Sequence, residues 1–117
     1  MKRSGLISLL ILFFAASLLS ACGEPTRDQY RDMAAEELCA EADRCGNLGE
    51  RTYNDCLVEE RARFSDLWPS SECSDGRINA DRYERCINRV KVAACDGNFF
   101  DGLSAWSECR ASQVCID

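Results

Sequence analysis

Nine cysteines are the residues of this chain best suited to chemistry, and they divide into one and eight. Cys22 stands alone near the N-terminus, directly after an apolar segment. The even number in the second group is typical of a disulfide framework if the chain is exported. The eight remaining cysteines are Cys39, Cys45, Cys56, Cys73, Cys86, Cys95, Cys109 and Cys115.

The N-terminus has the three parts of an export signal. Two basic residues precede an apolar run from Leu6 to Leu19, and small residues follow it. A membrane-spanning helix needs about 20 apolar residues, and polar sequence begins too early here for a comfortable span. We therefore expect residues 1–21 to be a signal peptide, residues 22–25 a short tether and residues 26–117 the folded domain.

The signal ends in Leu-Ser-Ala-Cys, which resembles the lipobox of bacterial lipoproteins. Those proteins are cleaved before the cysteine, which carries a diacylglyceryl group, and the new amine is usually acylated. The resemblance implies lipidation at Cys22, with palmitate-type chains anchoring the protein to a membrane of the cell envelope. In a Gram-negative host, Gly23 resembles outer-membrane sorting, because the usual inner-membrane retention residue there is aspartate. An uncleaved anchor and an ordinary secretory peptide remain the alternatives.

Disulfides account for the other eight cysteines better than a metal site does. Structural zinc sites favour ligand pairs about two to four residues apart. Here neighbouring cysteines are separated by at least five residues, and the chain has no histidine. Export would also place the thiols in an oxidising compartment. The sequence therefore predicts four disulfides, no metal site and no cofactor.

The pairing of these cysteines is less constrained than their number, since eight cysteines allow about a hundred pairings. Helix-hairpin geometry favours bonds across two of the expected turns, one bond between hairpins and one to the tail. On that basis we expect the pairs Cys45–Cys56, Cys95–Cys109, Cys39–Cys86 and Cys73–Cys115.

The elements that must position these residues are helices. Apolar residues recur at steps of three and four after the tether, which is the period of an amphipathic helix. Thr26 and Gln29 have the spacing of a capping box, and Gly46 is a natural left-handed stop. The first helix is therefore expected from Arg27 to Cys45.

A second helix is predicted after the turn that follows Gly46. Thr52 can cap it, and it must end before Pro69 because the residue preceding a proline avoids helical geometry. Its expected inner stripe is Tyr53, Cys56, Leu57, Glu60 and Phe64.

Two more helices complete the expected fold. Asn79 or Asp81 can cap a third helix that runs to about Cys95, and a shorter fourth helix is expected from Leu103 to Ser112. Strand-like alternation is absent and β-branched residues are few. The sequence therefore predicts an all-α, disulfide-stapled bundle of about four helices behind a lipoprotein signal peptide.

An aromatic residue precedes a cysteine by three positions in three of these helices. Residues three apart share a helix face, so we expect each aromatic side chain to pack beside a disulfide in the core. An aromatic binding box is the functional alternative. The three pairs are Tyr53 with Cys56, Tyr83 with Cys86, and Trp106 with Cys109.

The chain contains few side chains suited to catalysis. Without histidine there is no Ser-His or Cys-His nucleophile pair, and the secreted phospholipase A2 class is excluded. The adjacent acidic pairs Glu36-Glu37 and Glu59-Glu60 are typical of solvated helix faces. We therefore expect the protein not to be an enzyme.

Net charge excludes two further classes of partner. The whole chain carries a formal charge of −6, and the leader holds basic residues but no acidic ones. A nucleic-acid-binding domain would show a net basic footprint, and binding to anionic headgroups would need basic clusters. Attachment to the membrane is therefore expected through acyl chains at Cys22, not through electrostatics.

Oxygen-bearing side chains between residues 75 and 84 raise the question of a calcium site. An EF-hand loop requires an oxygen ligand at its third position, where counting from Asp75 gives Arg77. A turn at Asp75 followed by helix capping is the better interpretation.

Large apolar side chains on expected loops are the residues we select for contact with a partner. Such residues either cover the core or form exposed contact sites. Trp68, Phe99 and Phe100 are therefore the candidates for a surface that binds an unknown envelope or extracellular protein.

The leader, the cysteine order and one longer segment together resemble a known group of proteins. Asp75-Gly76-Arg77-Ile78-Asn79-Ala80-Asp81 leads into Tyr83-Glu84-Arg85-Cys86-Ile87, and Cys109 follows Cys95 closely. These features are similar to small cysteine-rich bacterial lipoproteins of uncharacterised function, abundant in myxobacteria and related Gram-negative lineages. The resemblance covers most of the mature chain and implies no catalytic residues.

Three classes of function remain at this stage. The expected one is a membrane-anchored, non-catalytic lipoprotein that acts as an envelope structural or protein-interaction module. The second is a disulfide-stapled extracytoplasmic inhibitor or ligand-binding protein, for which an exposed Trp68 loop would be the sign. The third is an enzyme, for which a buried carboxylate pair in a deep pocket would be the sign.

Overall fold

The computed structural model describes residues 23–96 and 104–116. In this part of the chain the regular elements are helices, joined by turns, with one isolated β-bridge between Ile78 and Cys115. The predicted all-α, disulfide-stapled fold is confirmed. The helices are α2 (Arg27–Arg44), α3 (Tyr53–Leu67), α4 (Ala80–Asp96) and α6 (Ala111–Val114).

The first helix begins and ends at the predicted signals. The Thr26 hydroxyl accepts a hydrogen bond from the Gln29 N–H (3.2 Å), and the Gln29 side chain accepts one from the Thr26 N–H (2.8 Å). After α2, Gly46 takes a positive φ of 71°. The Asn47 N–H then reaches back to the Ala42 carbonyl (2.8 Å), which satisfies a group that the helix end leaves unpaired.

The next two helices also begin at capping residues. Thr52 and Asp55 form a reciprocal capping box at the start of α3. At the start of α4 the Asn79 side chain accepts a hydrogen bond from the Arg82 N–H (3.0 Å). Of the two caps that the sequence allowed for this helix, Asn79 is therefore the one used.

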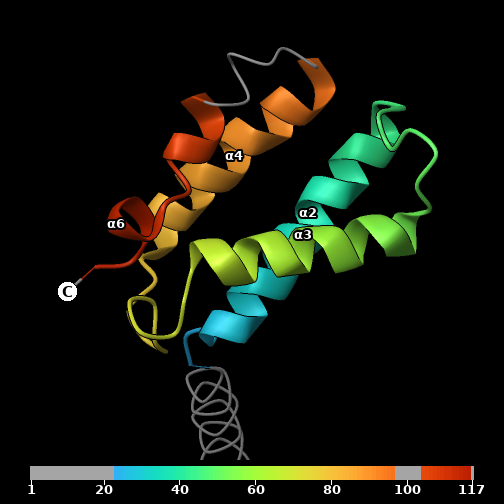
Figure 1. Cartoon of the computed structure of the whole chain (residues 1–117). Coiled ribbons are helices and arrows are strands. Elements are labelled where there is room, and N and C mark those ends of the chain that lie inside the picture. The colour runs from blue at the N-terminus through green and yellow to red at the C-terminus, as the bar shows by residue number, and fades with distance from the viewer. Residues whose placement is uncertain (1–22, 97–103, 117) are drawn as a thin grey trace, which may run out of the picture.

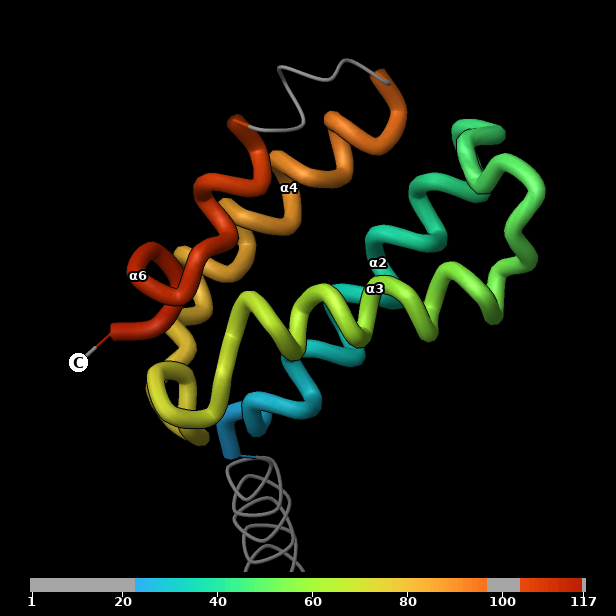
Figure 2. Tube along the Cα trace, viewed as in Figure 1, coloured from blue at the N-terminus to red at the C-terminus, as the bar shows by residue number. Residues whose placement is uncertain are grey.

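Three helices enclose the centre of the domain. The helix α3 crosses α2, and α4 also packs against α2 (Figure 1). The C-terminal segment runs back along α4, so that α6 lies near the beginning of that helix (Figure 2). This arrangement leaves the C-terminal halves of α2 and α4 facing α3 and the turn at residues 104–107.

Trp68 lies at the centre of the core, so the prediction that it forms an exposed partner contact is wrong. Its side chain is 0% exposed, and its ring packs on Phe64 and Tyr83, with centroids 4.9 and 5.9 Å away. The indole N–H donates to the Cys109 carbonyl (2.8 Å). The residue follows α3 directly, so its ring continues the buried face of the helix into the loop.

The predicted fourth helix is also wrong, because the structure breaks it in two. A helical turn covers residues 104–107, and α6 begins only at Ala111. Between them Arg110 has an extended backbone, with a ψ of 151°. Since the Cys109 carbonyl accepts its hydrogen bond from the Trp68 indole, it is directed into the core at the break.

Four disulfides crosslink the domain, as the cysteine count predicted. Of the expected pairs, Cys73–Cys115 is confirmed, while Cys45–Cys56, Cys95–Cys109 and Cys39–Cys86 are wrong. The Cα–Cα distances lie between 4.8 and 5.9 Å, within the usual disulfide range. The observed pairs are Cys39–Cys56, Cys45–Cys95, Cys73–Cys115 and Cys86–Cys109.

The wrong pairings are explained by where the helices pack. Cys39 lies inside α2 and faces α3, so it takes the partner on α3, Cys56. Cys45 is the C-cap of α2, beyond the crossing with α3, and it meets Cys95 near the end of α4. Two of the wrong bonds joined neighbouring cysteines across turns and the third joined the two expected hairpins, whereas the pairs of Cys39 and Cys45 form where α2 packs against α3 and α4.

The tail is held against the loop before α4. The Asn79 N–H donates to the Val114 carbonyl (3.0 Å), and the Ile116 N–H donates to the Arg77 carbonyl (2.9 Å). Together with the Cys73–Cys115 disulfide, these bonds place the C-terminal strand-like residues beside the loop in Figure 2.

The expected packing of aromatic residues beside disulfides holds in part. Tyr83 is buried beside the Cys86–Cys109 bond, and Trp106 is half-buried. Tyr53 is 38% exposed, which contradicts the prediction for that helix. As the first residue of α3, it lies one turn before the stretch that crosses α2.

Candidate ligand-binding pocket

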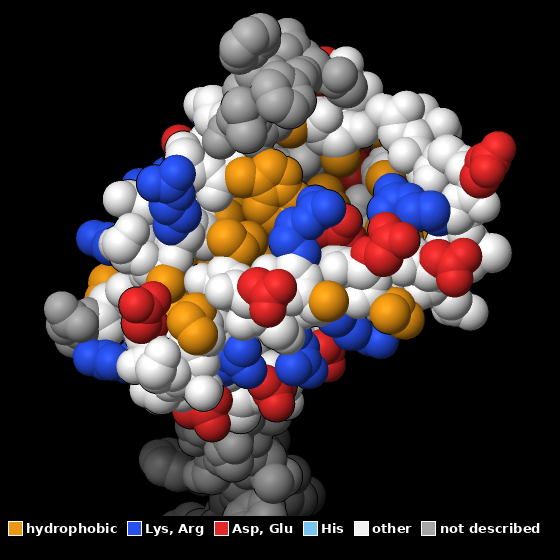
Figure 3. Space-filling view, in the orientation of Figure 1, with side chains coloured by type: hydrophobic (Ala, Val, Ile, Leu, Met, Phe, Trp, Pro, Cys, Tyr) orange, Lys and Arg blue, Asp and Glu red, His pale blue; other side chains and the backbone are white. Residues whose placement is uncertain are grey.

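A pocket of about 220 Å³ opens between α2, α3, α4 and the turn at residues 104–107. Figure 3 shows a hollow on this face, with hydrophobic side chains inside and both arginine or lysine and acidic side chains beside it. Its lining residues are Leu38, Ala42, Asn47, Arg51, Cys56, Glu60, Arg63, Val90, Ala93, Ala94 and Trp106.

Small side chains create this hollow. Ala42 on α2 and the pair Ala93 and Ala94 on α4 line it, and an alanine leaves room that a larger residue would fill. Leu38 and Val90, both buried, form the apolar surface behind them. The sequence therefore builds a recess at the place where three helices meet.

The helices α2 and α4, which form two walls of the pocket, are joined at both ends of their contact. On one side the Tyr83 hydroxyl donates to a Glu37 carboxylate oxygen (3.2 Å); burial, and then the Glu37 charge, raises the pKa of Tyr83, which keeps its proton. On the other side the Asn47 amide donates to the carbonyls of Ala94 (2.6 Å) and Cys95 (3.2 Å). With the Cys45–Cys95 bond, these contacts fix the spacing of α2 and α4 beside the pocket.

Glu60 is the polar residue buried in the wall of the pocket. It is 4% exposed and lies on the inner stripe of α3, where the period placed it. The prediction that Glu59-Glu60 forms a solvated pair is therefore wrong for Glu60. Glu59 points outward and pairs with Arg51 (2.7 Å). Successive helix residues point in different directions, so one acid of an adjacent pair can be buried while the other is exposed.

The Glu60 carboxylate is incompletely satisfied. Arg63 Nη1 lies 3.2 Å from Glu60 Oε2, close enough for an ion pair. That contact lacks hydrogen-bond geometry, and Oε2 is buried with no hydrogen-bond partner among the described residues. Burial raises the pKa of Glu60, while the charges of Arg63 and Arg51 oppose the rise. A buried acceptor without a donor is costly, so this atom marks a place where a donor would be favourable.

Two arginines border the pocket. Arg63 places its guanidinium 4.8 Å from the centre of the Trp106 ring, and its side chain is 50% exposed. Arg51 is held by its ion pair with Glu59 and by a bond from its Nε to the Leu48 carbonyl (3.1 Å). The pocket thus combines an apolar recess, one buried carboxylate and guanidinium donors at its edge.

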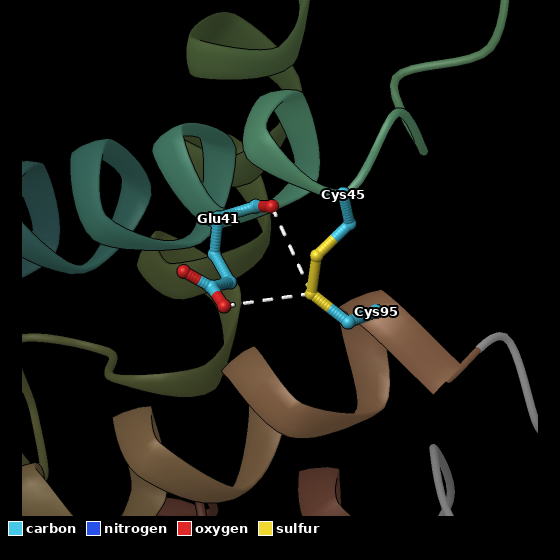
Figure 4. Close-up of side chains that lie close together, drawn as sticks. All are labelled: Glu41, Cys45 and Cys95. Carbon is cyan, nitrogen blue, oxygen red and sulfur yellow. Dashed lines mark hydrogen bonds between the residues drawn. A yellow bond between two sulfur atoms is a disulfide. The ribbon is translucent and has the colours of Figure 1, made fainter.

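A second group of side chains has the composition of a metal site but not its chemistry. Glu41, Cys45 and Cys95 bring one carboxylate and two sulfur atoms within 4.8 Å of one another. Figure 4 shows that the two sulfurs are bonded to each other, and it is the thiolate that binds a metal. The Glu41 carboxylate pairs with Arg44 (2.5 Å), and this hydrogen bond lowers its pKa.

The oxygen donors considered for calcium have structural partners. Asp75 Oδ1 accepts a hydrogen bond from the Arg27 N–H (2.9 Å), which links this loop to the start of α2. Asn79 caps α4, and Gly76 supplies the positive φ of the turn, 84°. The turn-and-cap interpretation is confirmed for these residues.

The remaining predicted site residues fall into two groups. Trp68 is buried, as described above. Cys22, Phe99 and Phe100 lie outside the described residues. Sequence reasoning missed Arg63 as part of a site and named Trp106 only in the alternative of an aromatic binding box, because the meeting of the two depends on the packing of the C-terminal segment. One signal was present: Glu60 is a charged residue on an otherwise apolar stripe.

Comparison with known proteins places the chain in a family. The model of a family of unknown function, DUF6184, matches residues 39–117. The chain belongs to this family. The DUF6184 match includes all eight disulfide cysteines and the residues Glu60, Arg63 and Trp106. No curated protein and no solved structure matches the chain.

None of the helices in residues 23–96 and 104–116 is both long enough and apolar enough to cross a membrane.

Proposed function

We propose that this DUF6184 protein is a non-catalytic binding module, held in the cell envelope by lipid on Cys22. The observation that carries the proposal is the pocket bordered by Glu60, Arg63 and Trp106. It combines convergent polar groups, which supply most of its exposed lining, with apolar side chains behind them, and convergent polar groups in a recess are typical of a ligand site. The pocket favours binding of a ligand over a purely structural role in the envelope.

The chemistry of the pocket supports binding over catalysis. Acid–base catalysis by carboxylates alone uses two of them, and Glu60 is the single carboxylate among the described lining residues. The cysteine in the lining, Cys56, is bonded to Cys39. The polar groups present are suited to hold a ligand by hydrogen bonds and charge.

The envelope location rests on the N-terminus and on the disulfides. The Leu-Ser-Ala-Cys sequence ending at Cys22 supports cleavage and acylation, and Gly23 supports outer-membrane sorting in a Gram-negative host. With α2 beginning at Arg27, the folded domain would follow the anchor closely. Four disulfides suit an oxidising compartment. This proposal agrees with the resemblance to small cysteine-rich lipoproteins of the myxobacterial type.

An inhibitor that presents a stiff loop is the weaker alternative. Its expected contact residue was Trp68, which is buried and bonded to the Cys109 carbonyl. The loop that follows is therefore anchored inward at its largest side chain, and the pocket is the better binding site.

The anchor is tested by mass spectrometry of protein extracted from native membranes. The expected N-terminal peptide begins at Cys22 and carries acyl chains. A soluble product with unmodified Cys22, or a chain that retains Met1, would contradict the proposed anchor.

Binding is tested by NMR on the full mature chain with Cys22→Ser, which removes the lipid and leaves the rest intact. The chain contains two tryptophans: the Trp106 indole reports on the pocket and the Trp68 indole on the core. Small neutral fragments should shift the Trp106 signal and leave the Trp68 signal in place. In Ala93→Phe, which fills the pocket, the shift should be lost. A fragment library that leaves the Trp106 signal unmoved would refute the pocket as a binding site.

A further inference from the structure

The charges around the pocket are paired, which bears on the ligand it would accept. Glu60 lies beside Arg63, and Arg51 lies beside Glu59. A cationic ligand near Glu60 would approach two guanidinium groups, while an anionic ligand near Arg63 would approach a buried carboxylate. Like charges close together in a desolvated site are unfavourable. A neutral ligand avoids both costs.

The polar atoms of the pocket favour a ligand group that both donates and accepts a hydrogen bond. Glu60 Oε2 is buried without a hydrogen-bond donor among the described residues. Arg63 makes one ion pair and stacks on Trp106, so most of its five N–H donors remain for other acceptors. A hydroxyl group can donate to a carboxylate and accept from a guanidinium at the same time. Arg63, half exposed and on a flexible stem, can shift to admit it.

The size and lining of the pocket limit the rest of the ligand. Its volume of about 220 Å³ lies below the roughly 300–1,000 Å³ typical of drug-sized ligand sites. A single ring fits such a space. Leu38 and Val90 form an apolar back wall that is nearly covered, while the half-buried Trp106 ring lies at the opening, and an aromatic ring pairs well with the edge or face of another.

We propose that the pocket binds a small, neutral, hydroxylated aromatic molecule, a single-ring phenol. The ring occupies the recess between α2 and α4 against Trp106, and the hydroxyl donates to the Glu60 carboxylate and accepts from Arg63. This assignment rests on the proposed binding function and specifies its ligand class. Hydrogen bonds to charged groups are stronger than neutral ones, so the hydroxyl should decide selectivity.

Four probes of the same ring size test the assignment: p-cresol, toluene, benzylamine and benzoate. Each is titrated into the Cys22→Ser mature chain, with the Trp106 indole as the reporter and the Trp68 indole as the internal control. We expect p-cresol to bind at least tenfold tighter than toluene, and tighter than either charged probe. Equal binding of toluene would refute the phenol assignment while leaving a binding pocket in place. Tighter binding of benzylamine or benzoate would replace it with a charged ligand.

Glu60→Gln provides the second part of the test. In this variant the affinity for p-cresol should fall at least fivefold, and that for toluene should stay unchanged. Asp66→Asn is the matched control, because Asp66 is an exposed acid on the same helix that does not line the pocket; it should leave both affinities unchanged. An unperturbed Trp68 signal verifies that the variant is folded. The comparison of p-cresol with toluene in the unsubstituted protein does not depend on any variant. Full p-cresol binding by folded Glu60→Gln would refute the role of the carboxylate.

N-acetyltyrosinamide separates a free phenol from a tyrosine side chain of a protein. Its amide groups must extend out of the pocket, so we expect it to bind more weakly than p-cresol. Tighter binding than p-cresol would contradict a small-molecule ligand and identify a protein side chain as the occupant.

Discussion

Glu60 and Arg63 lie one turn apart on α3, with Oε2 and Nη1 separated by 3.2 Å, yet the acid is buried and the arginine is half exposed. The ion pair therefore spans the boundary between the core and the solvent. Its buried end carries the cost of desolvation, which the arginine offsets only in part, since the pKa of Glu60 remains raised.

This raised pKa predicts a pH dependence of stability. Between the pKa of the unfolded chain and the higher pKa of the folded state, the folded protein binds more protons at Glu60, so this residue's contribution to the free energy of unfolding rises as the pH falls. Glu60→Gln has no proton to gain. Its stability advantage over the unsubstituted protein should therefore be largest near neutral pH and should shrink toward about pH 4. Arg63, Arg51 and Glu59 are the charged groups that act on Glu60.

Urea unfolding of both proteins across this range measures the effect. The control is Asp66→Asn, which removes an exposed acid of α3 that is not among the charges acting on Glu60, and it should show no such trend. An advantage of Glu60→Gln that grows as the pH falls would mean that the carboxylate is stabilised, not penalised, by its surroundings.

The hydrogen bond of the Trp68 indole predicts a loss of stability in a variant that lacks it. Trp68→Phe keeps an aromatic ring but removes the donor to the buried Cys109 carbonyl. An unsatisfied buried acceptor costs about 1–3 kcal/mol, and we expect a loss of that size in the free energy of unfolding. Trp106→Phe, at a half-buried position, should lose less. Equal losses in the two variants would contradict the central place of Trp68.

The disulfide pairing predicts a particular tryptic map. Trypsin leaves Cys95 and Cys109 together on the peptide of residues 92–110. In the observed pairing this peptide is bonded to two others, one with Cys45 and one with Cys86. Non-reducing digestion should therefore yield a three-peptide assembly, which reduction separates. A free 92–110 peptide with an internal bond would show instead that Cys95 pairs with Cys109.

The four disulfides should differ in their rate of reduction. Cys45 and Cys95 are both partly exposed, whereas Cys86 and Cys109 are 0% exposed. Reduction requires access of a thiolate to the sulfur, so limited dithiothreitol should open Cys45–Cys95 first. Timed alkylation with mass spectrometry would detect the first labelled pair. Early labelling of Cys86 and Cys109 would contradict the packing of that bond in the core.

Local signals in the sequence predicted most of the fold. The capping residues Thr26 and Thr52, the stop at Gly46 and the limit set by Pro69 act through neighbours in the chain, so they can be read without a structure. The even cysteine count likewise predicted four bonds, because it needs no knowledge of distance.

Long-range contacts were the part that the sequence did not predict. The partner of Cys45 depends on where α4 ends relative to α2, and the burial of Trp68 depends on the Cys109 carbonyl, which is distant in sequence. The pocket also depends on long-range contacts, since Glu60 and Trp106 come together only when the C-terminal segment folds back along α4. Only the acid on the inner stripe of α3 indicated it in advance.

The central claim is that the pocket beside Glu60 binds a ligand through that carboxylate. An experimental structure of the mature chain soaked with p-cresol tests it most directly. We predict a ring bounded by Leu38, Val90 and Trp106, with its hydroxyl oxygen about 2.5–3.0 Å from a Glu60 carboxylate oxygen, the range of an O–H···O hydrogen bond. An empty pocket at saturating p-cresol, or a ring whose hydroxyl points away from Glu60, would contradict the account.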